Sequence, residues 1–124
     1  MGARVSKNDS GLPTEAFPSA LGPATTLAAA GSAIGNAAAI ASRFTVVTGA
    51  DNAKGVILPS TASPGDEYVI YSSVASNGLL VYPHSTGDIN DGSGNASVAM
   101  EGKSVGRFIM LDGTTWVGMF TANT

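Results

Sequence analysis

The sequence predicts an all-β fold: a small β-sandwich or barrel of about eight strands, preceded by an extended N-terminal arm. Two observations carry this prediction. From Phe44 onward, short runs of β-branched and aromatic residues alternate with turn residues about every ten positions. Before that, Pro13, Pro18 and Pro23 recur at short intervals and leave no room for a helix. We therefore expect an arm over residues 1–23 and one β-rich domain over residues 24–124.

The second part of the chain contains the clearest strand signals, each bounded by Gly, Pro, Asn, Asp or Ser. Asn77-Gly78 predicts a type I′ hairpin, and Asp112-Gly113 predicts a second hairpin. Residues 84–95 are rich in Gly, Asp, Asn and Ser, and read as a long loop. The expected strands are 44–48, 55–58, 67–71, 79–82, 96–100, 105–111 and 116–120.

The stretch 24–41 is ambiguous because half of its residues are alanine, which favours a helix. Gly31 and Gly35 interrupt it, however, and Leu27, Ile34 and Ile40 do not form an apolar stripe. We prefer two short extended pieces, about 25–29 and 36–41, with a bend at Gly31-Ser32. A helix remains the alternative.

Several expected strands are apolar on both faces, notably 68–71, 79–82 and 108–111. A small sandwich with one face in water would alternate apolar and polar residues instead. Something must therefore cover the second face, and another copy of the same chain is the simplest cover. The sequence thus predicts a homo-oligomer.

Composition narrows the possible partners. Charged residues make up 12% of the chain, and the net charge is −3. Six Lys and Arg do not form a basic face, so we expect no nucleic-acid partner. Residues 1–6 match the short N-myristoylation pattern, but no polybasic run supplies a second anchor, so we expect no membrane partner either. The absence of cysteine excludes disulfides and thiolate metal sites.

Catalytic and metal-binding patterns are weak. His84 is the single histidine, and without a G-x-S-x-G motif we expect it to be a solvent-facing loop residue. The loop 88–95 lacks the EF-hand spacing, which leaves a turn region, or a calcium site built from Asp88, Asp91 and backbone carbonyls as the alternative. Asp66 and Glu67 would point to opposite faces of a strand. We therefore expect no enzyme, no cofactor and no metal.

The order of turns and apolar runs in the second part resembles a β-module of tailed-bacteriophage virion proteins. The matching segments are Gly55-Val56-Ile57-Leu58-Pro59, Pro64-Gly65-Asp66-Glu67-Tyr68-Val69-Ile70-Tyr71, Leu79-Leu80-Val81-Tyr82-Pro83, Asp88-Ile89-Asn90, Gly102-Lys103-Ser104 and Asp112-Gly113-Thr114-Thr115-Trp116. The similarity covers about residues 36–120 and is closest to capsid decoration (cement) proteins and end domains of tail fibres. The Ala-rich stretch 24–41 departs from it, and no catalytic residues come with it.

This resemblance implies a non-enzymatic virion structural protein, a homotrimer on the outer capsid surface that binds the major capsid protein of a phage head across capsomer junctions. The absence of a long shaft favours a decoration protein over a fibre fragment. The alternative is a tail or receptor-binding module that recognises a host-surface glycan. For the interface with the capsid or another partner, the candidates are the cationic and apolar residues of the arm: Arg4, Val5, Lys7, Leu12 and Phe17.

Overall fold

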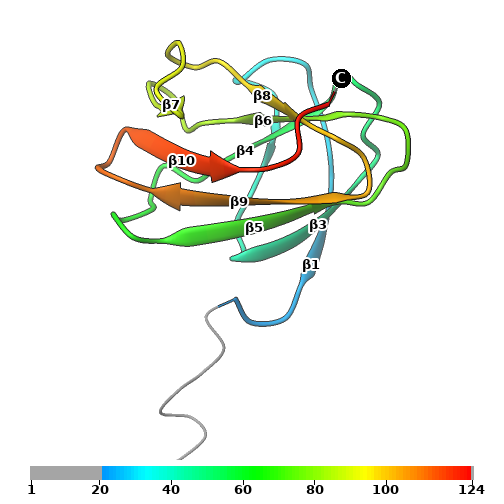
Figure 1. The fold of residues 1–124 in the computed structure, drawn as a ribbon, viewed down its shortest axis with the longest axis horizontal. Helices are drawn as coiled ribbons and strands as arrows, with labels where there is room; N and C mark the ends of the chain where they lie inside the picture. Colours follow the sequence, from blue (N-terminus) through cyan, green and yellow to red (C-terminus); the bar gives the residue numbers. More distant parts are fainter. Residues whose placement is uncertain (1–20, 124) are drawn as a thin grey trace, which may run out of the picture.

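The computed structural model describes residues 21–123, which form two β-sheets packed around a shared core. The six-stranded sheet has the order β1-β3-β5-β9-β10-β7, and the four-stranded sheet has the order β2-β4-β6-β8. In Figure 1, strands β3, β5, β9 and β10 lie in front of β4, β6 and β8. The ten strands are β1 (Thr25–Ala28), β2 (Ala38–Ala39), β3 (Phe44–Thr48), β4 (Gly55–Ile57), β5 (Glu67–Ser72), β6 (Leu79–Tyr82), β7 (Asp88–Ile89), β8 (Val98–Met100), β9 (Ser104–Met110) and β10 (Thr115–Met119).

The chain passes from one sheet to the other after almost every strand. From β1 to β9, odd-numbered strands lie in the six-stranded sheet and even-numbered strands lie in the four-stranded sheet. The first returns to each sheet run in the same direction: β1, β3 and β5 pair in parallel, as do β2, β4 and β6. Antiparallel pairing appears later, between β5 and β9, β9 and β10, and β6 and β8.

The all-β prediction is confirmed, with ten strands in a sandwich in place of about eight. Six of the seven expected strands appear within one residue of their expected bounds. The seventh, expected over 96–100, is shorter and starts at Val98. The expected loop 84–95 contains the two-residue strand β7, which pairs with β10.

The hairpin prediction at Asn77-Gly78 is wrong. The strands on either side, β5 and β6, belong to different sheets. Asn77 and Gly78 instead hold two loops together: the Gly78 N–H donates to Asn52 Oδ1 over 2.6 Å, and Asn77 Nδ2 donates to the carbonyl of Ala50 over 3.2 Å. Positive φ falls on Ser76, not on Asn77.

The second hairpin prediction, at Asp112-Gly113, is confirmed between β9 and β10. Gly113 has φ +99°, a conformation that favours glycine. The Asp112 carboxylate accepts hydrogen bonds from the N–H groups of Thr114 and Thr115, over 3.0 and 2.8 Å. These bonds lower the pKa of Asp112, because they stabilise the ionised carboxylate.

The Ala-rich stretch forms two short strands, as preferred, and contains no helix. β1 covers residues 25–28 and β2 covers residues 38–39, with a turn between them. The bend is set by Gly31, which has φ +67° and lies against Asn36 so closely that a Cβ atom would overlap it. Asn36 Oδ1 accepts the N–H groups of Ser32 and Ala33, over 3.1 and 3.0 Å.

The core lies between the two sheets and draws on both. Phe108 is fully buried and stacks on Phe120, with ring centroids 5.9 Å apart. Gly106 and Gly118 leave the space that this ring occupies, because a Cβ at either position would come within 2.9 Å of it. The other large, fully buried apolar side chains are Trp116, Leu58, Ile70, Leu79, Met100, Met110, Val47, Val56 and Val81.

Candidate interaction surface

The outward side of the six-stranded sheet is mainly apolar. In the central strands, side chains that alternate with the core residues point away from the four-stranded sheet. The strand register places them in rows, with Val46 beside Tyr71 and Tyr71 beside Val105, and Ile109 beside Val117. We call this surface the outer sheet face and define it by Val46, Val69, Tyr71, Val105, Ile109, Val117 and Met119.

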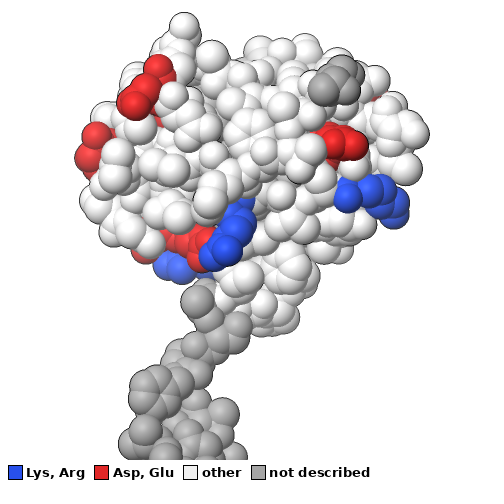
Figure 2. All heavy atoms as spheres, in the orientation of Figure 1, with Lys and Arg blue, Asp and Glu red and all other residues white. Residues whose placement is uncertain are grey.

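The strongly exposed large apolar side chains are concentrated at one side of this face. Four large apolar side chains of residues 21–123 are strongly exposed, and all belong to β9, β10 or the hairpin between them. They are Val105 (51%), Leu111 (57%), Val117 (39%) and Met119 (52%). Figure 2 shows the same side of the molecule as a broad uncharged surface with a few charged groups between and around the white areas.

Two ion pairs lie on and beside the outer sheet face. Arg107 contacts Glu67 over 2.5 Å, and both lie on the face. Arg43 contacts Asp66 over 3.1 Å at the start of β5. Asp66 and Glu67 therefore each pair with an arginine, and Asp66 lies just before β5, not within a strand as expected. Paired charges leave this face apolar in character and without a net electrostatic bias.

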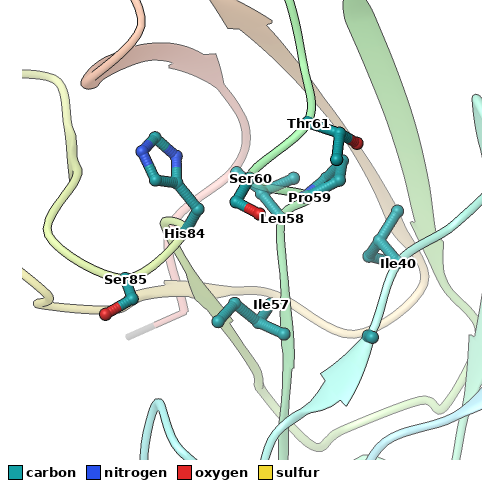
Figure 3. A pocket seen from close by; sticks show the side chains of 9 residues that line it. Ile40, Ile57, Leu58, Pro59, Ser60, Thr61, His84 and Ser85 are labelled. Carbon is teal, nitrogen blue, oxygen red and sulfur yellow. The ribbon is translucent and has the colours of Figure 1, made fainter.

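A second apolar feature lies at the C-terminal ends of β2, β4 and β6. A hollow of about 340 Å³ opens beside β2, at the ends of β4 and β6. Figure 3 shows Ile57 and Ile40 on one side of it, and His84 and Ser85 on the other. We call it the β2–β6 hollow, and its main lining residues are Ile40, Ile57, Leu58, Pro59, His84 and Ser85.

His84 is buried, so the expectation of a solvent-facing loop residue is wrong. Its side chain is 7% exposed, and its Nδ1 accepts a hydrogen bond from Trp116 Nε1 over 3.0 Å. An accepting Nδ1 carries no proton, so the imidazole is held as the neutral tautomer with its proton on Nε2. The role that this geometry supports is structural: His84 satisfies the indole N–H of a tryptophan that has no contact with water.

Replacing His84 with leucine should lower the free energy of unfolding by about 1–3 kcal/mol, because the buried Trp116 N–H loses its acceptor. His84→Asn should cost less, since the Asn Oδ1 can replace Nδ1 as the acceptor. Urea unfolding of the two variants and the wild type measures the difference. Equal stability of the Leu and Asn variants would contradict this role.

The loop 88–95 lies along the edge of β10, with which its strand β7 pairs. Among residues 21–123, no three His, Asp or Glu side chains come together as a metal-binding group. Asp88 instead accepts the Thr115 hydroxyl over 3.0 Å. Asn90 accepts the Gly118 N–H over 2.8 Å and donates to the Gly118 carbonyl over 3.1 Å. These bonds tie the loop to the edge of β10.

The five interface candidates of the arm, Arg4, Val5, Lys7, Leu12 and Phe17, lie outside the described residues. The sequence indicated the two-sided apolar strands that form the outer sheet face, but it did not indicate the hollow. No local signal could have revealed the hollow, because its walls come from three segments, 39–40, 57–61 and 84–85, that are far apart in the chain. The described part of the chain contains no helical segment suited to crossing a bilayer.

No family model matches the chain, and no curated protein or solved structure shows significant similarity to it.

Proposed function

We propose that this protein is a non-enzymatic structural subunit that assembles with copies of itself through the outer sheet face. The observation that carries the proposal is the exposure of Val105, Val117 and Met119 on a sheet whose other face packs in the core. Apolar surface of this kind gains about 25 cal/mol per Å² when it leaves water. Three copies that turn this face toward a common axis would each contact two neighbours, which gives a homotrimer.

The size of the face argues for a further contact. β3, β5, β9 and β10 are about 4.8 Å apart and run for about six residues each, so their shared face covers roughly 400 Å². A stable interface buries about 800 Å² on each partner. A trimer held by this face alone would be weak, and the arm, residues 1–23, is available to supply the rest.

In this proposal the trimer is a decoration protein on the outer surface of a phage head. It binds the major capsid protein across capsomer junctions and holds neighbouring capsomers together. The resemblance of residues 36–120 to virion β-modules supports this setting. Many symmetric copies on a shell turn a weak individual contact into a large total stabilisation. The arm residues Arg4, Val5, Lys7, Leu12 and Phe17 are the proposed contacts with the capsid or a neighbouring copy.

Deleting residues 1–22 tests the arm. We expect the truncated protein to keep its fold, because all ten strands lie between residues 25 and 119, and to lose binding to heads. Co-sedimentation with phage heads measures binding, and circular dichroism checks the fold. Undiminished co-sedimentation of the truncated protein would remove the arm from the proposed interface.

A glycan-binding tail module remains the competing function. It predicts binding on a glycan array and does not require the arm. The hollow gives this alternative little support, because sugar sites combine aromatic stacking with several directed polar groups, and the hollow has no Trp, Tyr or Phe in its lining. Specific hits on a glycan array without binding to heads would favour the tail module.

A further inference from the structure

We propose that the β2–β6 hollow receives apolar side chains of the N-terminal arm, namely those of Leu12 and Phe17. The hollow is large enough for such an occupant: at about 340 Å³, it lies in the range of sites that take up apolar groups. Neither Leu12 nor Phe17 belongs to the described residues, and the inference rests on the chemistry of the hollow and on the sequence before residue 21.

The lining of the hollow matches an extended apolar segment. Ile40 and Leu58 are buried at its base, at 3% and 1% exposure, and Ile57 is partly exposed beside them. No Asp, Glu, Lys or Arg lines it, so nothing in it selects a charged ligand. Hydroxyl groups of Ser60, Thr61 and Ser85 stand near the opening, where they can bond to the backbone of a bound segment.

The sequence of the arm supplies a matching occupant. Leu12 and Phe17 each come directly before a proline, in Leu12-Pro13 and Phe17-Pro18. A residue before proline is pushed toward extended conformations, and proline offers no N–H that would need a partner. Such a segment presents an apolar side chain at low entropic cost. Leu12 and Phe17 are the two largest apolar side chains between Gly2 and Ala20. Their burial therefore gives the largest gain in free energy of any side chains in this segment.

The length of the arm allows this contact. Nine residues separate Leu12 from Leu21, where the described chain starts, and nine extended residues span about 30 Å. A domain of about 100 residues has a radius of gyration of about 13 Å. β1 starts beside the start of β3, and Ile40 of the hollow lies four residues before β3. The described chain therefore starts at the end of the sandwich where the hollow lies, within the reach of about 30 Å of the arm. This inference narrows the proposed contacts with the capsid from five arm residues to Arg4, Val5 and Lys7, because Leu12 and Phe17 would be occupied in the hollow.

Site-specific photo-cross-linking in the full-length protein tests this inference. A benzophenone amino acid replaces Ser60, an exposed residue at the opening of the hollow, and a second variant carries it at Ser93, an exposed loop residue outside the hollow lining. We expect irradiation at position 60 to link residues 1–20, as identified by mass spectrometry, and irradiation at position 93 not to link them.

The combined substitution Leu12→Ser and Phe17→Ser should reduce this cross-link about tenfold or more, because burial of one such side chain favours the bound state by that factor. Val5→Ser should leave the yield unchanged. The fluorescence emission of Trp116 is a second measure of whether the hollow is occupied. His84 accepts a hydrogen bond from this single tryptophan and also lines the hollow. Absence of links to residues 1–20, or an unchanged yield in the double variant, would overturn the inference. Neither result depends on binding to heads, so the inference and the proposed function can fail separately.

Discussion

Introducing glutamate at both Val105 and Val117 is expected to convert the oligomer into a folded monomer. Both side chains lie on the outer sheet face and are already 51% and 39% exposed, so the change costs the isolated chain little. In the oligomer, each copy would instead bury two carboxylates against apolar neighbours such as Tyr71 and Ile109, without a cationic partner directly across the strands. Sedimentation velocity should show the mass of a single chain.

The matched control places two glutamates away from this face, with Ala75→Glu and Ser93→Glu, both in exposed loops. It changes the net charge by the same amount and should keep the wild-type mass. If both double variants sediment like the wild type, the outer sheet face is not the contact between copies.

Phe108→Ala is expected to have the largest effect on stability of any single change considered. The ring fills the space left by Gly106 and Gly118 and stacks on Phe120. Loss of a fully buried phenylalanine costs about 3–5 kcal/mol, against a total stability of about 5–15 kcal/mol for a typical domain. Urea unfolding at a fixed protein concentration, followed by Trp116 fluorescence, should show a correspondingly lower midpoint.

Phe108→Leu serves as the comparison, because it keeps most of the apolar volume. It should cost about 1–2 kcal/mol. A loss below about 1 kcal/mol for Phe108→Ala would mean that the two glycines do not create a packing site that depends on this ring.

Much of the fold could be predicted because its signals are local. Runs of β-branched and aromatic residues bounded by Gly, Pro and Asn identified the strands, and Asp112-Gly113 identified a hairpin in which the turn residues decide the connection. In the stretch 24–41, the glycine at position 31 outweighed the helix propensity of the alanines, because its positive φ and its contact with Asn36 fix a bend.

Strand pairing could not be predicted in the same way. The chain alternates between the two sheets, so the partner of β3 is β5, more than 20 residues away, and not the neighbouring β4. The hairpin expected at Asn77-Gly78 failed for this reason, since a turn sequence does not reveal which sheet the next strand joins.

The candidate site was predicted only in part. Two-sided apolar strands indicated a surface in need of a cover, and the exposed side chains of β9 and β10 locate it. The burial of His84 escaped prediction, because its partner Trp116 lies 32 residues further along the chain. A contact of that separation leaves no trace in the sequence around either residue.

The native mass of the purified full-length protein tests most directly whether copies of this chain cover the apolar surface of β9 and β10. Native mass spectrometry, supported by sedimentation at several concentrations, should give three times the chain mass of 12.3 kDa. A stable single-chain species at all concentrations would contradict the account, because these side chains would then remain in water with no partner to shield them.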